Sequence, residues 1–455
     1  MDLFGTAGIR GPASEQVTPS LALRVGRAAA RDAVERADGR PAFVVGRDGR
    51  ETGAALAAAT ESGLTSGGAD VRRVGVVPTP ALAFASRGRR GVMLTASHNP
   101  PADNGIKLFA DGEEYGEAAE RRVEDGVAAD PEPTDWDDWG DRREASPLSA
   151  YREAVVGYAS EHGAALDGLS VAVDCGNGVG ALAAPQVLRA LGADVDALNA
   201  SVDGHFPGRE SKPTSESLAD LRAYVAAGDH AFGVGHDGDA DRVVVVDPDG
   251  EVVHEDTVVA VLAEHYVRTV DAADPVVVTT PNASGRVDER VHAAGGRVER
   301  VALGYLHDGI DAARADGAAV AFAAEPWKHV HTQFGGWIDA VASVAVFARL
   351  VAAEGLSELR DPVTERPYRK DDVRCPDGAK PAAMERLETA LPAAFPDADV
   401  ATAHGVRLTF PDDAWLLVRP SGTEPYVRVY AESDAVDDLV AAASDVVADV
   451  VGRVE

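Results

Sequence analysis

The sequence has few cysteines and no long apolar run. Its two cysteines, Cys175 and Cys375, lie far apart and form no Cys-x-x-Cys pair, so neither a disulfide framework nor a zinc site is expected. No uncharged apolar segment approaches the roughly 18 residues that a membrane helix needs. The segment Met1 to Gly5 has neither the basic nor the apolar part of an export signal. We therefore expect a cytoplasmic protein.

Positive charge is also scarce. The chain has 43 Lys and Arg residues against 75 Asp and Glu residues, for a net charge of −32, and only five of the basic residues are lysines. The acidic residues are spread along the chain, and their repulsion is tolerable mainly in salt, where the Debye length falls to about 3 Å at 1 M. This indicates a halophile's surface; the alternative is an acidic protein with a cationic partner. Nucleic acid and anionic membranes are not expected partners.

Short valine-rich runs alternate with longer stretches of helical composition. The runs end at Gly, Asp or Asn or at a turn, and they lie at residues 42–46, 91–94, 170–173, 243–246, 275–278 and 318–322. Many are separated by alanine-rich or apolar-periodic stretches such as Leu21 to Ala37. The alternation predicts α/β layers, in which ligands bind beyond the carboxyl ends of the strands.

The chain is too long for one hydrophobic core, and its 455 residues suggest about three domains. An acidic stretch containing Pro and Trp, Ala128 to Pro147, is predicted to be a linker or a surface excursion. Prolines between Arg360 and Pro376 separate a carboxyl-terminal unit of about 80 residues.

Ser97 ends an apolar stretch in the run Thr-Ala-Ser-His-Asn-Pro at residues 95–100, and Lys107 follows shortly after it. A hydroxyl at the mouth of a strand, with an imidazole from His98 beside it, has the parts of a nucleophile that carries a phosphoryl group. The alternative is a serine in an ordinary turn, since Ser-His-Asn-Pro is also good turn chemistry.

Three aspartates alternate in Asp-Gly-Asp-Ala-Asp-Arg, at Asp237, Asp239 and Asp241. In an extended loop their carboxylates can face one point and offer the hard oxygen ligands that suit Mg²⁺. A calcium EF-hand is excluded because its sixth and twelfth positions would be Arg242 and Pro248. The alternative is a solvated acidic turn.

A third segment combines hydroxyls and arginines near the carboxyl terminus. The turn Ser421, Gly422 and Thr423 offers successive amides and two hydroxyls, and Arg419 and Arg428 flank it. Such a turn can form a concavity for a phosphate; the alternative is a surface hairpin.

The segment 176–181 matches the dinucleotide pattern Gly-x-Gly-x-x-Ala, which raises a nicotinamide enzyme as an alternative. That pattern needs an acidic residue at the end of the next strand, and the run Asp196 to Asn199 ends without one. A tight strand-to-helix turn explains the glycines better.

Four segments in this order resemble motifs of the alpha-D-phosphohexomutases, the phosphoglucomutase and phosphomannomutase family. They are Gly-Thr-Ala-Gly-Ile-Arg-Gly at 5–11, the Ser97 run, the aspartate loop and the segment 419–428. The resemblance implies three similar α/β domains with mixed sheets and a smaller α+β carboxyl-terminal domain around a central cleft. The expected domains carry the phosphoserine at 1–145, the metal at 150–252, sugar recognition at 253–362 and a phosphate site at 372–455.

The resemblance also implies roles for single residues. Ser97 would be phosphorylated and would complete a Mg²⁺ site with the three aspartates, while Arg242 would help with its charge. Lys107 becomes a candidate general acid or base at the sugar hydroxyl. Arg10 would lie near the reacting phosphate, with a simple salt bridge as its alternative. The turn at Ser421 would hold the phosphate that is not being transferred.

The family's sugar-reading motif Gly-Glu-x-Ser-Gly-His is altered in this chain. Glu325 and His329 keep their places, whereas Trp327 and Lys328 stand at the serine and glycine positions. Glu325 can accept hydrogen bonds from two sugar hydroxyls. Trp327 can stack on a pyranose or can be a partly buried core residue.

These features predict a Mg²⁺-dependent phosphohexomutase, a monomer or homodimer, that interconverts hexose 1- and 6-phosphates through a bisphosphate. Glucose or mannose phosphate is favoured, because Lys328 would repel the protonated amino group of glucosamine phosphate. Glucosamine or pentose phosphate is the alternative within the family. A phosphatase that uses the same phosphoserine, or a non-catalytic sugar-phosphate-binding relative, is the alternative class.

Overall fold

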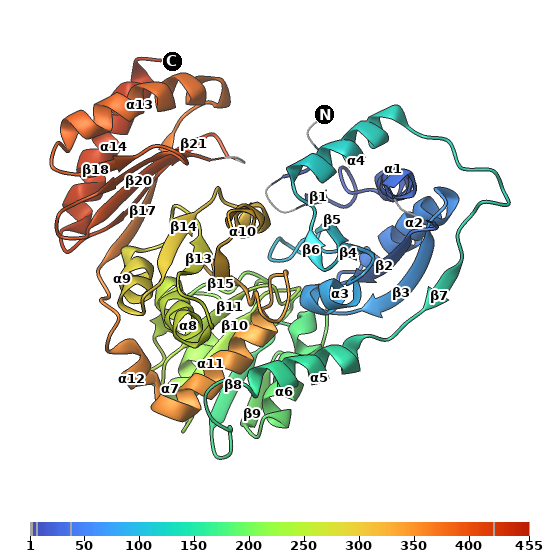
Figure 1. Cartoon of the computed structure of the whole chain (residues 1–455), viewed down its shortest axis with the longest axis horizontal. Helices are drawn as coiled ribbons and strands as arrows, with labels where there is room; N and C mark the ends of the chain where they lie inside the picture. Colours follow the sequence, from blue (N-terminus) through green and yellow to red (C-terminus); the bar gives the residue numbers. More distant parts are fainter. Residues whose placement is uncertain (1–2, 6–7, 37–38, 422–423, 455) are drawn as a thin grey trace. The chain divides into compact units, whose positions relative to one another are not determined.

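The computed structural model describes residues 3–5, 8–36, 39–421 and 424–454. The chain forms two compact units, one of residues Met1–Leu262 with Ala321–Arg360 and one of Ala263–Val320 with Asp361–Glu455. Figure 1 shows the elements of both. Within the described ranges, no helix is long and apolar enough to cross a membrane.

The first unit begins with a mixed sheet. Its strands run in the order β1-β5-β4-β2-β3-β7, with β6 paired to β5; β2 is parallel to β3 and β4, and β5 is antiparallel to β4. The strands are β1 Ile9–Pro12, β2 Ala42–Arg47, β3 Asp70–Val76, β4 Arg90–Leu94, β5 Asp103–Ala110, β6 Glu113–Glu114 and β7 Arg142–Glu144. The stretch expected as a linker or a surface excursion, Ala128 to Pro147, therefore contributes the exposed edge strand β7.

Four helices accompany this sheet: α1 Pro19–Arg36, α2 Gly53–Ser66, α3 Thr79–Ala85 and α4 Glu117–Ala129. Small residues let α1 and α2 pack closely, since a Cβ at Gly63 would lie 2.1 Å from the carbonyl oxygen of Leu23. The apolar faces of α1, α2 and α4 bury Val25, Leu64 and Val123 against the strands in one core.

A second mixed sheet follows, in the order β12-β11-β10-β8-β9. Its strands are β8 Ser170–Asp174, β9 Asp194–Leu198, β10 Phe232–His236, β11 Val243–Val246 and β12 Val252–Val253. Its accompanying helices are α5 Leu148–Ala159, η1 Val179–Leu182, α6 Ala184–Ala190 and α7 Ala219–Ala227. Helix α8 Glu255–Thr269 follows β12, and the division between the two units falls within it, after Leu262. The antiparallel pair β10 and β11 makes the loop between His236 and Val243 a hairpin connection.

The rest of the first unit contains β15 Ala319–Glu325 from Ala321 onward, its antiparallel partner β16 Lys328–Val330, and then α11 Ala340–Glu354 and α12 Leu356–Arg360. Asp339 caps α11 by accepting a 2.8 Å hydrogen bond from the Ala342 amide. The same buried carboxylate accepts hydrogen bonds from Tyr151 Oη at 2.8 Å and Trp337 Nε1 at 2.9 Å.

The second unit has a parallel pair and an antiparallel sheet. The parallel pair is β13 Pro275–Thr279 with β14 Arg297–Arg300, accompanied by α9 Gly285–Ala293 and α10 Leu306–Ala315. The antiparallel sheet runs in the order β17 Tyr368–Arg374, β21 Tyr426–Glu432, β20 Trp415–Pro420, β19 Val406–Thr409 and β18 Asp399–Ala401. Its helices are η2 Asp377–Ala379, α13 Lys380–Ala394 and α14 Val436–Gly452. Buried Leu387, Val418 and Val447 belong to one core between these helices and the sheet.

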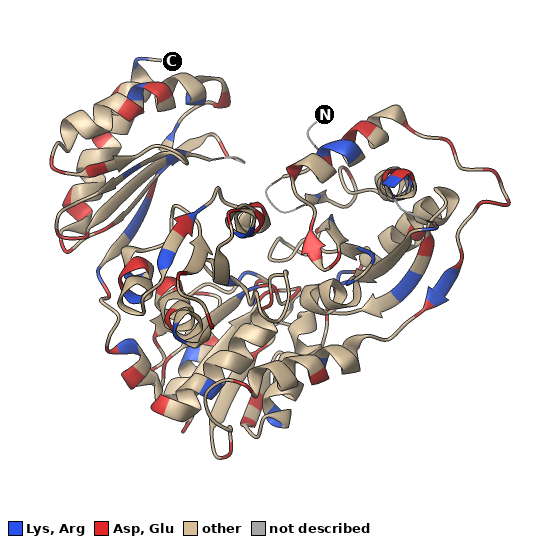
Figure 2. Cartoon of the chain, in the orientation of Figure 1, with Lys and Arg blue, Asp and Glu red and all other residues tan. Residues whose placement is uncertain are grey.

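The predicted α/β class with mixed sheets and a final α+β sheet is confirmed. Figure 2 shows acidic residues on helices and loops throughout the chain, as the sequence indicated.

Candidate active site

Ser97 lies just beyond the carboxyl end of β4 and is fully buried. Its φ of 51° is in the left-handed region, which few residues other than glycine adopt. The hydroxyl donates to Oδ2 of Asp237 at 2.6 Å and lies 3.3 Å from Nδ1 of His98. The structure therefore brings two predicted motifs, far apart in sequence, to one nucleophile.

The guanidinium of Arg50 holds the loop that carries Ser97. It donates to four backbone carbonyls, those of Ser97 at 2.9 Å, Asn99 at 2.7 Å, Pro100 at 2.6 Å and Asp103 at 2.9 Å. Arg50 is fully buried. Sequence reasoning missed Arg50, because its contacts with the Ser97 loop are all to main-chain oxygens, which leave no motif in the sequence of that loop.

Asp48 completes this support. Its Oδ2 accepts from Nε of Arg50 at 3.0 Å and from the hydroxyl of Thr95 at 2.7 Å. Thr95 in turn accepts a 2.9 Å hydrogen bond from the Ser97 amide. The turn after β2 thus fixes the backbone around the nucleophile.

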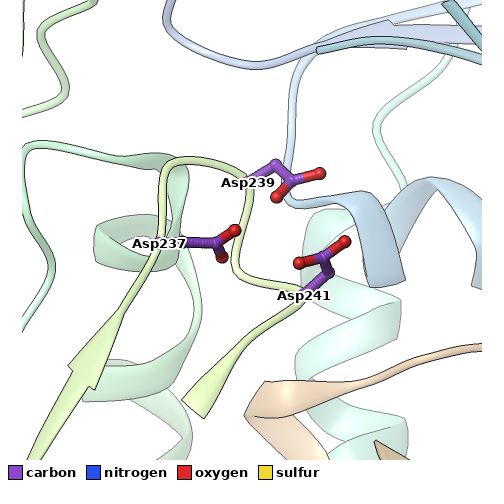
Figure 3. A group of neighbouring side chains, drawn as sticks. All are labelled: Asp237, Asp239 and Asp241. Carbon is purple, nitrogen blue, oxygen red and sulfur yellow. The ribbon is translucent and has the colours of Figure 1, made fainter. Parts of the chain in front are cut away.

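Asp237, Asp239 and Asp241 all project from the loop between β10 and β11 (Figure 3). One oxygen of each lies within 4.8 Å of the others, and all three residues are buried. Oδ1 of Asp239 has no hydrogen-bond donor in the described part of the chain. Three buried carboxylates with an unused oxygen are a donor set that fits a hard divalent cation such as Mg²⁺.

The carboxylates have unequal electrostatic surroundings. Burial, together with the charges of Asp241 and Asp239, raises the pKa of Asp237 well above its usual range. Burial acts the same way on Asp241, but the cations Lys107, Lys328 and Arg242 outweigh it and hold the pKa of Asp241 well below its usual range.

Lys107 lies on β5 and is almost completely buried. Its Nζ is 2.9 Å from Oδ2 of Asp241, 3.5 Å from Oδ2 of Asp239 and 3.6 Å from Oε1 of Glu114. Burial opposes its charge, but these carboxylates outweigh burial and raise the pKa of Lys107. The structure thus brings Lys107 to the aspartate cluster.

Lys328 is a second buried cation at this cluster. It is only 7% exposed, and its Nζ lies 3.4 Å from Oδ2 of Asp241. The sequence drew attention to Lys328 only as a change in the sugar-reading motif. The pairing of β15 with β16 turns that motif toward the aspartate loop, where the Val243 amide donates to the Trp327 carbonyl at 3.1 Å.

Trp327 has a φ of 70°, and its ring packs against a buried cluster that includes Leu218 and Val244. The guanidinium carbon of Arg242 lies 5.7 Å from the ring centroid. This agrees with the partly buried position considered from sequence. A substrate role for either residue stays a prediction.

His98 and Arg10 belong to the same surroundings. Strand β1 pairs with β5 and sets Arg10 opposite Gly105. Burial, followed by the charges of Arg242, Arg10 and Lys328, lowers the pKa of His98 to about 2. His98 is therefore a neutral imidazole beside the Ser97 hydroxyl.

His329 and Glu325 lie on opposite strands of the β15 and β16 pair, where Glu325 is the register partner of Lys328. His329 is buried, and its Nδ1 lies 3.0 Å from Oγ of Ser343. Burial lowers the pKa of His329 to about 3. Sugar recognition by Glu325 and His329 stays a prediction.

The predicted phosphate turn lies in the second unit. Arg419 and Arg428 are register partners on β20 and β21, and Arg419 donates to the Tyr430 hydroxyl at 3.0 Å. Gly422 and Thr423 lie outside the described residues.

Lys380 is a residue of this turn that sequence reasoning missed. Its Nζ donates to the carbonyls of Ser421 at 2.7 Å and Glu424 at 2.6 Å. A buried ammonium therefore supports the turn through its backbone, and, like Arg50, it has no sequence signature.

The glycines at 176–181 form the expected strand-to-helix turn between β8 and η1. A Cβ at Gly178 would lie 2.8 Å from the Gly238 carbonyl oxygen, and the Val179 amide donates to that oxygen at 3.0 Å. The glycine thus permits close backbone contact with the aspartate loop.

Comparison with known proteins identifies relatives over nearly the whole chain. Models of phosphoglucomutase/phosphomannomutase match alpha/beta/alpha domain I at residues 1–134, alpha/beta/alpha domain II at 149–250 and the C-terminal domain at 372–450. A phosphopentomutase of Thermococcus kodakarensis and a probable phosphoglucosamine mutase of Methanopyrus kandleri are each 41% identical, over 95% of this chain and 94% of theirs. The crystal structure of a phosphoglucomutase/phosphomannomutase family protein from Burkholderia thailandensis superimposes with a TM-score of 0.83 at 25% identity, covering 100% of this chain and 97% of the other.

Proposed function

Because the chain belongs to the phosphoglucomutase/phosphomannomutase family, we propose that it interconverts hexose 1- and 6-phosphates by way of a phosphoserine at Ser97. The protein is a phosphomutase, an isomerase of carbohydrate metabolism that moves a phosphoryl group within its substrate. The observation that carries the proposal is the 2.6 Å hydrogen bond from Ser97 to Asp237, within a buried cluster of three carboxylates.

The aspartate loop supports a metal ion in this reaction. Asp237, Asp239 and Asp241 would hold Mg²⁺ together with the phosphate carried by Ser97. The ion would supply positive charge that offsets the charge of the transferring phosphoryl group.

In the first half-reaction, a free hydroxyl oxygen of the hexose phosphate attacks the phosphorus on Ser97. The bond from phosphorus to Ser97 Oγ breaks as the bond to the sugar oxygen forms. The sugar hydroxyl gives up one proton and Oγ takes one up, so the step releases no net proton. We assign Lys107 as the acid or base at the sugar hydroxyl, and Arg10 and Arg242 as charges that orient the phosphoryl group.

The product of this step is a hexose bisphosphate, and its other phosphate returns to Ser97 in the second half-reaction. The non-transferred phosphate would be held by Arg419, Ser421 and Arg428 with the neighbouring Gly422 and Thr423. Paired arginines beside a turn braced by Lys380 support this assignment.

Glucose or mannose phosphate is the proposed substrate. The low exposure of Lys328 supports this choice, because a buried ammonium disfavours a protonated amino sugar more than an exposed one would. Pentose phosphate is the second candidate, because the phosphopentomutase of Thermococcus kodakarensis is 41% identical.

The test is a panel of glucose, mannose, glucosamine and ribose 1-phosphates, assayed for the rearranged phosphate and for free inorganic phosphate. We expect kcat/KM to be highest for glucose or mannose 1-phosphate, with no phosphate release. A highest value for ribose 1-phosphate would favour the pentose candidate. Release of phosphate without rearrangement would identify a phosphatase, and no turnover would identify a binding protein.

A further inference from the structure

A hollow of about 460 Å³ opens on the first sheet, away from Ser97. It is lined by parts of β2 and β3, by the end of α3 with the loop after it, and by residues 145–147 after β7. Arg89 lines it just before β4 begins, whereas Ser97 follows the other end of the same strand. No residue assigned above to the active site lines this hollow.

Three arginines, Arg72, Arg87 and Arg89, give the hollow its charge, and we call it the arginine pocket. Arg72 is the register partner of Val44, so both side chains are on one face of the sheet. The adjacent Arg73 is on the other face, where it forms a salt bridge with Glu61 of α2. Among the described residues, no carboxylate lies within 4 Å of the Arg72 guanidinium.

Arg87 and Arg89 are held by contacts that leave their charge without a counterion. The guanidinium of Arg87 lies 3.9 Å from the centroid of the Phe84 ring, and its Nε donates to the Phe84 carbonyl at 3.1 Å. Arg89 donates to the Ala85 carbonyl at 2.9 Å. In the part of the chain that the structure describes, neither has a carboxylate within 4 Å.

Arg72 and Arg89 lie close enough to influence each other electrostatically. Burial and the nearby charge of Arg72 lower the pKa of Arg89. The chain has 75 acidic residues against 43 basic ones, yet these three arginines line one concavity, and none has a carboxylate within 4 Å among the described residues. Their planar guanidinium groups suit phosphate oxygens, which they can bind through paired hydrogen bonds.

We propose that the arginine pocket binds a small molecule that carries a diphosphate or two phosphates, at a site separate from the mutase centre. Its volume is within the usual range for small-molecule sites, about 300–1,000 Å³. Val44, Val74 and Pro147 provide an apolar wall for the organic part of such a ligand.

Pyrophosphate is the probe, measured by titration calorimetry on the full chain at one fixed KCl concentration. The test variant is R72Q/R89Q, and the matched control is R143Q. Arg143 is the register partner of Arg72 on β7, but it lies outside the pocket lining and 3.7 Å from Asp141. Circular dichroism and melting curves confirm that each variant folds.

We expect one class of pyrophosphate sites in the wild type to weaken about tenfold or more in R72Q/R89Q. We expect R143Q to bind like the wild type, and R72Q/R89Q to retain mutase activity on sugar phosphates. Equal binding by R72Q/R89Q and the wild type would overturn the proposal, as would an equal loss in R143Q, which would indicate general surface charge. Because mutase activity is measured separately, failure of the proposed function would leave this test unaffected.

Discussion

The hydroxyl of Ser97 donates a 2.6 Å hydrogen bond to Oδ2 of Asp237, and this bond joins the loop after β4 to the loop between β10 and β11. A second link runs parallel to it, because Ser211 Oγ donates to the Ser97 carbonyl at 2.9 Å and accepts from the Gly238 amide at 3.1 Å. The nucleophile and the carboxylate cluster are therefore positioned together before any substrate binds.

The first prediction concerns the phosphoryl carrier. We expect purified protein to contain phosphate on Ser97, and Ser97→Ala to lower kcat by about 10³-fold or more, because the variant loses the hydroxyl that lies between Asp237 and His98. Intact-mass measurement with peptide mapping locates the phosphate, and a melting curve checks the fold. Phosphate on another residue, or normal turnover by the alanine variant, would show that the mechanism is wrong.

The second prediction concerns the metal. Asp239→Asn removes one of three hard ligands. We therefore expect the Kd for Mg²⁺ to rise by about tenfold or more. Because a ligand that binds only the folded state raises its stability, Mg²⁺ should raise the Tm of the wild type more than that of the variant. Calorimetry and melting curves measure both. Asp249→Asn, in an exposed turn, is the control and should behave like the wild type; equal Mg²⁺ affinity in all three proteins would contradict a metal site.

The third prediction concerns the altered sugar motif. We expect the double change Trp327→Ser and Lys328→Gly to alter the ratios of kcat/KM among sugar 1-phosphates more than it alters phosphorylation of Ser97. The reason is that the two side chains add bulk and charge beside Glu325, and sites that hydrogen-bond a sugar discriminate strongly among its analogues. Steady-state kinetics on the sugar panel measure the ratios, and an unchanged ranking would place specificity in another loop.

Lys328→Gly alone separates the two contributions. Since its ammonium lies 3.4 Å from Asp241, we expect a lower kcat for every sugar, in addition to any change in ranking. A variant with wild-type kcat for all sugars would show that this contact does not affect phosphoryl transfer.

The fourth prediction concerns salt. Acidic residues are distributed throughout the chain (Figure 2), and the net charge is −32. We expect Tm and activity to rise as KCl approaches molar concentrations, because screening weakens the repulsion. A Tm that stays constant from low to molar KCl would remove the halophile interpretation without affecting the catalytic one.

The fifth prediction concerns pH. Burial raises the pKa of Asp339 from its ordinary value to about 6. The folded state therefore binds this proton more tightly than the unfolded state, so the contribution of Asp339 to stability is greatest below about pH 4 and is lost as pH rises through 6. Between pH 4 and 7, we expect the wild type to lose about 2 kcal/mol of unfolding free energy relative to Asp339→Asn. Urea unfolding of both proteins at the two pH values measures the difference, and parallel curves would contradict the assignment.

The alternation of valine-rich runs and helical stretches is sufficient to predict the α/β class. A strand that is buried on both faces of a sheet appears in the sequence as a short continuous apolar run. Ser97 and the aspartates could be found because their chemistry lies within short segments. Arg50 and Lys380 could not, since each binds main-chain carbonyls that any sequence provides.

Lys328 was recognised as an unusual residue, but its contact could not be predicted. The direction of the Lys328 side chain depends on the pairing of β15 with β16 and on the hydrogen bond that the Val243 amide donates to the Trp327 carbonyl. Contacts between segments that are distant in sequence leave no pattern in the local sequence. The four domain boundaries remain predictions.

Arg50 holds the Ser97 loop through hydrogen bonds to four main-chain carbonyls of that loop and to none of its side chains. Substitutions among residues 99–103 that preserve the backbone path would therefore leave the anchor in place. The loop could diversify during evolution while the serine kept its position. Randomised libraries at these positions would thus be a practical starting point for engineering new acceptor preferences.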